Sequence, residues 1–423
     1  MIIHIMSLQK KYWGTSILVR EVNHMNEQLP LQGLKILDIS TMLAAPWVST
    51  HLADFGAEVL KIEHPEYGDH ARKYGAQKDG KSVLWKSLNR NKKSITLNFS
   101  KMEGQELLKE IIKDYDVMIE NFRPGTLEKW NLSWEEIEKV NPNLILLRVS
   151  GFGQKGPYSE RRGFGTVAEG MSGFTSINGD PTGPPILPGI PLADGLSGIA
   201  GALMVMIATY SKQNHQTKGQ VIDLSLYEPL MRLLEPHLLA YDQLGIIANR
   251  VGNGSSQTAP RNAYPTKDGN WVALSASAQS IFENLCIAID REDLIINEKF
   301  NTNKNRLNNV AELDEIISGW IVKRDLDQVV EILNESGAVV GPMYNVKQLY
   351  QDPHYTYRES FVSVTDDEFG EMRVPNVLAK LSKTPGKIST LGPKHSEHTI
   401  EFLKESLKMG DKEISELKRG GII

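Results

Sequence analysis

The chain has 423 residues, of which 40% are hydrophobic and 23% are charged. This composition is typical of a globular protein and excludes a fibrous or disordered one. The length exceeds what one hydrophobic core usually organises, so two or three domains are expected. The 47 basic and 52 acidic residues give a formal charge of -5. That balance argues against a nucleic acid as the partner, because domains that bind nucleic acids usually carry a concentrated basic excess.

The ends and the apolar stretches of the chain set further limits. Cys286 is the single cysteine, so no intrachain disulfide can form; its apolar surroundings predict a buried side chain and not a nucleophile. A reducing, cytoplasmic setting is expected. The longest strongly apolar stretch, 199–210, is shorter than the roughly 20 residues of a bilayer span, so no membrane partner is expected. Residues 1–30 lack a continuous apolar region and a cleavage site, and are interpreted as an N-terminal extension.

Strands and helices are predicted to alternate after Gly33. Short apolar runs flanked by turn residues predict strands at 34–39, 58–62, 94–97, 116–119 and 144–149. Helices are predicted at 47–55 and 101–113, and Ser133 with Glu136 makes a capping box for a third, shorter helix. This alternation predicts an α/β protein with a parallel, Rossmann-like sheet flanked by helices.

The pattern changes after one more predicted strand, 221–226. An apolar helix is predicted at 227–244, with a kink or a break at Pro236. The segment 252–256 is rich in Gly, Ser and Asn, and predicts a loop at a domain boundary.

The remaining third of the chain predicts a second, smaller domain. Short strands are expected at 271–274 and 338–340, and a final helical segment, 397–417, is expected to return to the first domain. The predicted parts are an extension (1–30), a large domain (31–245), a small inserted α/β domain (246–350), and a return segment with the C-terminal part of the large domain (351–423).

A glycine-rich motif after the fifth strand is the first candidate site. Residues 151–156 match GxGxxG, which would suggest a nicotinamide-dependent oxidoreductase. Pro157 follows the third glycine, where a helix should be under way, and no strand ending in an acid follows about 20 residues later. An ordinary glycine-rich turn is therefore the preferred interpretation.

Asp194 precedes an apolar helical run and has small neighbours, Ala193, Gly195 and Gly198. One interpretation is a helix N-cap. The other is a carboxylate nucleophile that the helix dipole keeps ionised, with room for a substrate to approach. The two interpretations are compatible.

The segment 121–125 lies between a strand and a helix, where open α/β sheets bind ligands. Arg123, Lys129 and Arg162 are candidates for contacts to phosphates, although each taken singly also fits a solvated surface charge. The histidines His51, His64 and His70 show no metal-binding spacing, so no metal is expected.

Taken in order, several motifs resemble those of the class III (CaiB/BaiF) CoA-transferases, which include enzymes similar to formyl-CoA transferase. The matching segments are 31–38, 52–63, 68–69, 89–94, 120–125, 150–157, 189–198 and 219–223. They span most of the chain from 31 to about 265, and the similarity continues more loosely to the C-terminus.

The resemblance implies that Asp194 is the nucleophile of an enzyme that moves CoA from an acyl-CoA donor to a free carboxylic acid. Asp194 would form a mixed anhydride with the acyl group and then an aspartyl-CoA thioester, which conserves the thioester energy. No tightly bound cofactor is implied, because coenzyme A is a substrate. The fold implied is a Rossmann-like large domain with an inserted small domain, in an interlocked homodimer.

The resemblance also implies which residues contact CoA and the intermediates. The CoA contacts carried over are Leu43, Ala44, His64, Leu97, Asn121, Phe122, Arg123, Lys129 and Arg162. His64 and Lys129 stand where the family commonly has arginine, and His64 loses its charge above its pKa. The glycine-rich loop that covers the intermediates falls on Gly252, Gly254 and Gln257, and Ser255 and Ser256 make it less glycine-rich than in formyl-CoA transferases.

Two alternative functions remain to be weighed. A 2-methylacyl-CoA racemase needs a second acid–base group, a histidine within Gly-His-Asp, where this chain has Gly163-Phe164-Gly165. Phenylalanine cannot exchange a proton with the substrate, so the racemase is disfavoured. A non-catalytic CoA-binding protein is the other alternative. The donor and acceptor acids stay open at this point, with oxalate, succinate and other short carboxylates all included.

Overall fold

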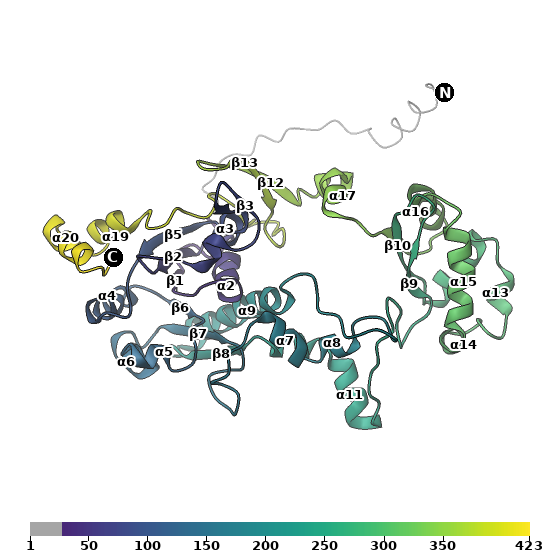
Figure 1. Cartoon of the computed structure of the whole chain (residues 1–423), viewed down its shortest axis with the longest axis horizontal. Helices are drawn as coiled ribbons and strands as arrows, with labels where there is room; N and C mark the ends of the chain where they lie inside the picture. The colour runs from purple at the N-terminus through teal and green to yellow at the C-terminus, as the bar shows by residue number, and fades with distance from the viewer. Residues whose placement is uncertain (1–27) are drawn as a thin grey trace, which may run out of the picture.

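A six-stranded parallel sheet forms the centre of the computed structural model, which describes residues 28–423 (Figure 1). The strand order is β5-β2-β1-β6-β7-β8, and every neighbouring pair is parallel. The strands are β1 (Lys35–Asp38), β2 (Glu58–Glu63), β5 (Lys92–Thr96), β6 (Val117–Glu120), β7 (Ile145–Ser150) and β8 (Val221–Ser225). All six lie where the sequence predicted them, so the predicted α/β fold class is confirmed.

Each face of the sheet carries its own hydrophobic core, because successive strand residues point to opposite faces. Ile36 packs in the core on one face, and Leu37 packs in the core on the other. In the same way, Val117 and Ile119 share the first core, whereas Met118 belongs to the second. Strands buried on both sides read as continuous apolar runs, which is why they were recognisable in the sequence.

Helices cover both faces. The first face is covered by α2 (Ala44–Ala53) and α9 (Leu192–His215), and the second by α4 (Met102–Ile112), α6 (Trp134–Val140), α19 (Thr399–Glu405) and α20 (Asp411–Arg419). The C-terminal segment returns to this body, and the helical segment expected at 397–417 is divided into two helices. Lys408 has a positive φ and Gly410 begins a new helix, so the chain forms two helices there.

Helix α9 is longer than the apolar stretch 199–210 suggested. It has 24 residues, and an 18-residue window of it has a mean hydropathy of 1.6; among residues 28–423 it is the one helix whose length and composition would allow a bilayer span. It lies against α2 at very close range, because a Cβ added to Gly198 would stand 2.7 Å from Cβ of Trp47, and one added to Gly201 would stand 2.6 Å from Cγ2 of Val48. Glycines on this face therefore permit the packing.

The helix predicted at 227–244 is broken, as Pro236 suggested. It consists of α10 (Glu228–Arg232) and α11 (Glu235–Leu244). Pro236 lies in the first turn of α11, where a missing N–H leaves no hydrogen bond unmade. The shorter elements of this body are η1 (His70–Lys73), β3 (Gln77–Lys78), β4 (Lys81–Ser82), α3 (Val83–Leu88), α5 (Thr126–Lys129), α7 (Gly165–Met171) and α8 (Phe174–Ile177).

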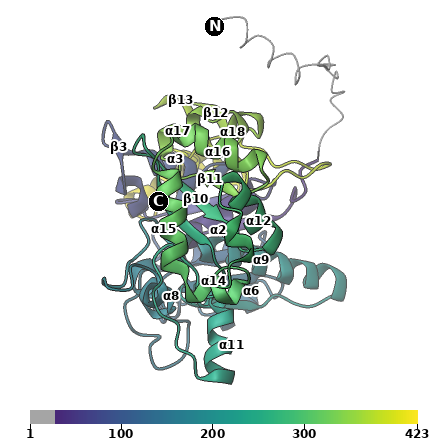
Figure 2. The same ribbon diagram turned by 90° about the vertical axis from the view of Figure 1, so that its right-hand side faces the viewer.

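A second body with its own core follows α11 and stands apart from the large sheet in Figure 1; it faces the viewer in Figure 2. Its antiparallel sheet has the order β11-β10-β9. Its elements are β9 (Arg261–Pro265), β10 (Trp271–Ser275), α12 (Gln279–Ala288), α13 (Asp293–Ile296), α14 (Asn303–Asn308), α15 (Val310–Ile321), α16 (Leu326–Glu335) and β11 (Val340–Pro342). Cys286 of α12 is fully buried in this core, and burial raises the pKa of its thiol to about 12, so it is the inert side chain that the sequence predicted.

The chain then returns towards the large sheet. The returning elements are α17 (Val346–Gln351), α18 (Pro353–Tyr357), β12 (Phe361–Asp366) and β13 (Gly370–Pro375). The turn of the β12–β13 hairpin is fixed to α3, because Nζ of Lys86 lies 2.9 Å from Oδ2 of Asp366 and 2.7 Å from Oε2 of Glu368. Helix α17 begins ahead of the domain boundary predicted at 350.

Candidate active site

The carboxyl ends of four neighbouring strands gather most of the predicted CoA contacts. Parallel strands present the loops at their carboxyl ends along one edge of the sheet, where α/β proteins bind ligands. The contacts there are Leu43 and Ala44 after β1, His64 after β2, Leu97 after β5, and Asn121, Phe122 and Arg123 after β6. The fold thus brings together residues that are up to 80 positions apart in the sequence.

A cavity of about 320 Å³ opens at this edge. His64, Leu97 and Phe122 line it, together with Tyr67 and Trp130. The ring of Phe122 meets that of Trp130 edge-on, with centroids 5.0 Å apart. A concave site of this size with planar aromatic walls suits a flat, partly apolar group such as a nucleobase.

His64 contributes an aromatic ring to this cavity, but it does not provide a constant positive charge. Its ring stacks on that of Tyr67 at 3.7 Å between centroids, and its Nδ1 accepts a hydrogen bond from the Glu66 N–H. Burial, opposed by Glu66 and assisted by His395, lowers the pKa of His64. The imidazole is therefore mostly neutral at pH 7, and the phosphate contact that an arginine would make is weakened.

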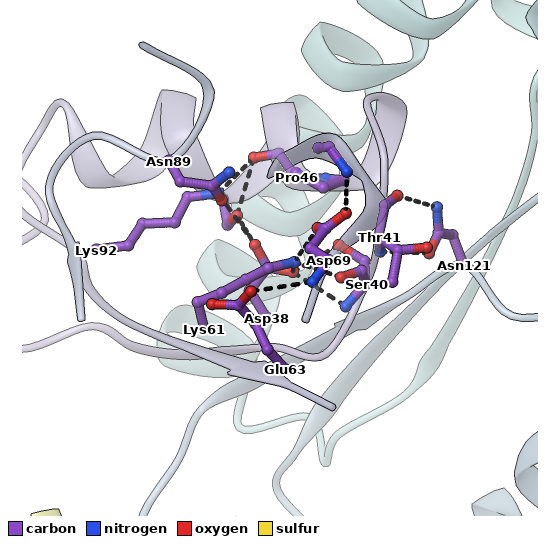
Figure 3. A network of polar contacts seen from close by, with 12 residues as sticks. Asp38, Ser40, Thr41, Pro46, Lys61, Glu63, Asp69, Asn89, Lys92 and Asn121 are labelled. Carbon is purple, nitrogen blue, oxygen red and sulfur yellow. Dashed lines mark hydrogen bonds and ion pairs between the residues drawn. The ribbon is translucent and has the colours of Figure 1, made fainter. Parts of the chain in front are cut away.

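The loop 40–46 carries Leu43 and Ala44. A network of buried charged side chains holds this loop in place (Figure 3). Nζ of Lys92 donates to the Pro46 carbonyl at 2.8 Å, and Nζ of Lys61 donates to the Ser40 carbonyl. The Met42 N–H donates to Oδ1 of Asp69 at 3.0 Å. Two strands, β2 and β5, and the loop that carries Asp69 therefore hold the loop 40–46 at several points.

Asp38 makes this network possible, because it lies between the two ammonium groups in the protein interior. Its Oδ1 lies 3.4 Å from Nζ of Lys61 and its Oδ2 lies 3.0 Å from Nζ of Lys92, and all three side chains are shielded from solvent. Burial alone would raise the pKa of Asp38, but Lys61, Lys92 and the hydroxyls of Ser40 and Ser49 lower it well below its usual range. Burial lowers the pKa of Lys92 to about 8, against the opposing effect of Asp38.

Asn121 joins two of the binding loops. Its Nδ2 donates to the Thr41 carbonyl at 2.7 Å, and its Oδ1 accepts from the Thr41 N–H at 2.8 Å. The next residue is fixed as well, since the Phe122 N–H donates to Oε2 of Glu120 at 2.6 Å. Asn121 therefore has a structural task that the sequence did not reveal, namely to set the spacing of the β1 and β6 loops.

Asp194 lies in the first turn of α9 but does not cap it. The N-cap is Pro191 and no side chain fulfils that role, so the N-cap interpretation of Asp194 is wrong. The carboxylate instead lies against α7, because a Cβ added to Gly165 would stand 2.3 Å from Oδ2 of Asp194. A glycine is thus required at position 165 for the carboxylate to occupy its place.

A second carboxylate, Glu169, lies beside this turn and was missed in the sequence. It is 3% exposed, and its Oε1 accepts a hydrogen bond from the Ala193 N–H at 3.3 Å. Burial first, and the charge of Glu169 second, raise the pKa of Asp194 to about 6. Burial and Glu169 therefore oppose the ionisation that the helix dipole was expected to favour. One signal was available: Glu169 follows Gly165 by one helical turn within a segment of small residues.

Three predicted phosphate contacts, Arg123, Lys129 and Arg162, are exposed side chains. Within residues 28–423 none of them forms an ion pair with a carboxylate, in contrast to most other arginines near the sheet edge such as Arg72 and Arg148. They are consequently available to an external anion. Arg162 also stands three residues before Gly165, the neighbour of Asp194.

The motif 151–156 forms a turn that leads into no helix, because α7 begins only at Gly165. The Gln154 N–H in this turn donates to both carboxylate oxygens of Asp223 on β8, at 3.0 and 2.9 Å. A backbone donor occupied by an internal carboxylate does not form the phosphate cradle of a dinucleotide site. This agrees with the interpretation as an ordinary turn.

The loop that carries Gly252, Gly254 and Gln257 lies between the two bodies. The Gly252 N–H donates to the Gly179 carbonyl at 3.0 Å, in the connection between α8 and α9. At its other end, Nδ2 of Asn303 in α14 donates to the Gln257 carbonyl at 2.9 Å. Within the described chain no hydrogen bond joins this loop to Asp194. Its role as a cover stays a prediction.

Among residues 28–423, no group of three or more His, Cys, Asp and Glu side chains is arranged to hold a metal ion. The site instead combines an aromatic cavity, a rigid loop beside it, exposed surface cations and a carboxylate in the first turn of a helix.

Comparison with known proteins places the chain in a family. Residues 31–399 match the family model described as CoA-transferase family III. Succinyl-CoA–D-citramalate CoA-transferase of Chloroflexus aurantiacus is 39% identical over 395 residues, which cover 93% of this chain and 98% of that protein. Human succinyl-CoA:glutarate CoA-transferase is 33% identical over 409 residues, which cover 96% and 92%.

A solved structure of the same kind supports the assignment. The crystal structure of a CAIB/BAIF family protein from Brucella suis superposes with a TM-score of 0.80 at 30% sequence identity, over 89% of this chain and 99% of that one. The family resemblance inferred from the ordered motifs is thereby confirmed. The chain belongs to family III of the CoA-transferases.

Proposed function

We propose that this enzyme moves CoA from a short dicarboxylic acyl-CoA, with succinyl-CoA as the first candidate, to a second short dicarboxylic acid through covalent intermediates on Asp194. The observation that carries the proposal is the course of the loop 40–46. Ser40 and Thr41 line the aromatic cavity, and the carbonyl of Ala44 would lie 3.4 Å from a Cβ at position 198 of α9, the helix that carries Asp194.

A long, two-ended ligand fits this layout. The cavity offers planar walls for the adenine of CoA, and the exposed cations Arg123 and Lys129 offer charge for its phosphates. From there, the pantetheine arm would follow the loop 40–46 towards the first turn of α9. The buried network beneath that loop then has a function, because a rigid loop loses little conformational entropy on binding.

The chemistry requires Asp194 as a carboxylate. One of its oxygens forms a bond to the thioester carbonyl carbon, and the C–S bond breaks with its electron pair leaving on CoA as the thiolate. The thiolate then attacks the Asp194 carbonyl of the mixed anhydride, and the donor acid leaves as a carboxylate. The acceptor carboxylate repeats the two steps in reverse and regenerates Asp194, so no external energy source is needed.

Two features support dicarboxylic substrates. The relatives in Chloroflexus aurantiacus and in humans are named for succinyl-CoA with citramalate or glutarate. In this chain, the exposed Arg162 follows the turn after β7 and stands three residues before the glycine that touches Asp194. A guanidinium in that region can bind the distal carboxylate of a short diacid by paired hydrogen bonds.

The experiment is a transfer assay with a panel of acids. Purified protein is mixed with succinyl-CoA and, in turn, citramalate, malate, glutarate, oxalate and a monocarboxylic acid, and the new acyl-CoA is identified by mass spectrometry. Transfer to one or more diacids by the wild type, and none by Asp194→Asn, is the expected result. Hydrolysis without transfer, or proton exchange at the α-carbon of a 2-methylacyl-CoA, would contradict the proposal.

A further inference from the structure

Glu169 is a buried carboxylate that the transfer chemistry described above does not use. It lies in α7, one turn after Gly165, so that one face of this short helix presents both the glycine in contact with Asp194 and the glutamate beside Ala193. With 3% of its surface exposed, Glu169 is as shielded as a core residue. Charged side chains are almost never buried to this extent unless they are paired.

Among residues 28–423, the partner of the Glu169 side chain is a backbone N–H. In the described part of the chain no lysine, arginine or histidine forms an ion pair with Glu169, and its one side-chain hydrogen bond is the long 3.3 Å bond from the Ala193 N–H. By contrast, the buried carboxylates Asp38, Glu63 and Glu120 each have a cationic partner. The negative charge of Glu169 is therefore left uncompensated except by the N-terminal end of α9.

The other groups near this turn do not neutralise it. Helix α2 contributes Ala44 and Trp47, neither of which titrates, and its His51 is instead influenced by Asp54, Arg90 and Lys92. On α10, Glu228 accepts a hydrogen bond from Ser225. The remaining charged residue of α10, Arg232, is paired with Glu235. Two like charges, Asp194 and Glu169, thus share a partly buried site.

We propose that Glu169 is an electrostatic positioning residue, which destabilises the Asp194 carboxylate relative to the uncharged anhydride and thioester that Asp194 forms with substrate. This inference rests on the proposed function. In the first step an Asp194 oxygen bonds to the acyl carbon and loses its negative charge, which leaves on the CoA thiolate. In the second step the thiolate bonds to the Asp194 carbonyl carbon and the charge leaves on the departing donor carboxylate, so Asp194 is uncharged in both intermediates. The repulsion from Glu169 exists only in the free enzyme, so its presence favours the covalent forms.

Glu169 also has a structural task, because it is the acceptor for a first-turn N–H of α9. The test must separate this task from the effect of charge. Glu169→Gln keeps an oxygen acceptor of the same length and removes the charge, whereas Glu169→Ala removes both. Glu169→Asp keeps the charge and withdraws it by one methylene, and serves as the conservative variant.

The measurement is the ratio of Asp194-bound CoA to free Asp194 after equilibration with succinyl-CoA and succinate, read by intact mass, together with the pH profile of adduct formation. For Glu169→Gln we expect a Tm at or above that of the wild type, since the repulsion is removed, a ratio lowered about tenfold, and an acid limb shifted to lower pH by about one unit. Glu169→Asp should recover most of the ratio, and Glu169→Ala should also lower the Tm.

The outcomes are distinguishable. A wild-type adduct with the same ratio and the same pH profile in Glu169→Gln overturns this inference and leaves the proposed function intact. A ratio that falls only in proportion to Tm across the variants also overturns it, since a cap alone would then suffice. If Glu169→Gln does not fold, a ratio in Glu169→Asp equal to that of Glu169→Ala refutes the role of charge. Absence of any adduct in the wild type overturns the proposed function together with the inference.

Discussion

Replacing Asp194 by asparagine should stabilise the folded protein at neutral pH while abolishing transfer. The physical reason is that burial and Glu169 hold the pKa of Asp194 at about 6 in the folded state, against an ordinary value of 3.8. That difference of about 2 pKa units corresponds to ~3 kcal/mol of unfavourable free energy once the carboxyl is ionised in both states. Asparagine keeps the shape and carries no charge, so a gain of ~1–3 kcal/mol is expected after allowance for solvent that still reaches the site.

The gain must depend on pH in a defined direction. Below 3.8 the carboxyl is protonated in both the folded and the unfolded chain, and Asp194→Asn has no advantage. Between 3.8 and about 6 the unfolded chain releases its proton first, so the wild type loses stability relative to the variant as the pH rises. Above about 6 the difference is constant.

The assay is thermal unfolding of both proteins at pH values from about 4 to about 8. We expect a Tm that is a few degrees higher for Asp194→Asn at neutral pH, and a difference that vanishes towards pH ~4. A variant that is no more stable than the wild type at neutral pH, or an advantage that persists unchanged at pH ~4, would refute the reasoning. The proposed nucleophile would then occupy an unfavourable site, which is a recurrent form of the trade between stability and activity.

Three more predictions follow from the contacts. Gly165→Ala should lower kcat about 100-fold by displacing the nucleophile, whereas Gly170→Ala, on the same helix in open space, should leave kcat unchanged. Lys92→Met should lower the free energy of unfolding by about 3 kcal/mol and raise the KM for acyl-CoA. Lys93→Met, at an exposed position, should change neither quantity. Chemical denaturation and steady-state kinetics measure the two effects. The exposed apolar stripe of α9 predicts a homodimer, so Leu203→Glu should shift the mass in light scattering towards the monomer; a wild type that is already monomeric would contradict this.

The sheet was predictable because its signal is local. Strands such as 144–149 are buried on both faces, so an unbroken apolar run between turn residues identifies them without knowledge of their neighbours. The break near Pro236 was predictable for the same reason, since proline acts on its own segment. The ends of α9 were not predictable, because its first turns are rich in glycine, whose helix propensity is low. There the packing against Trp47 and Val48 decides the structure.

The sequence pointed to Asp194 as the candidate nucleophile, but it did not show the electrostatics around it. The position of Asp194 followed from an ordered set of motifs, whereas its raised pKa depends on Glu169, 25 positions earlier in the chain, and on burial. His64 was expected as a weak cation, and only the stacking on Tyr67 and its burial reveal a neutral ring. The buried ion pair between Asp38 and Lys92 was not predictable either. In the sequence both are simply polar residues at strand ends, and a pair 54 residues apart leaves no local pattern.

The most direct test of the central claim is the chemical identity of the intermediate. Wild-type protein and Asp194→Asn are mixed with succinyl-CoA, treated with hydroxylamine, digested, and mapped by mass spectrometry. We predict a hydroxamate on the peptide that contains Asp194 in the wild type, dependent on succinyl-CoA and absent from the variant. Efficient CoA transfer by the wild type without any modification of Asp194, or a modified residue elsewhere in the chain, would contradict the account.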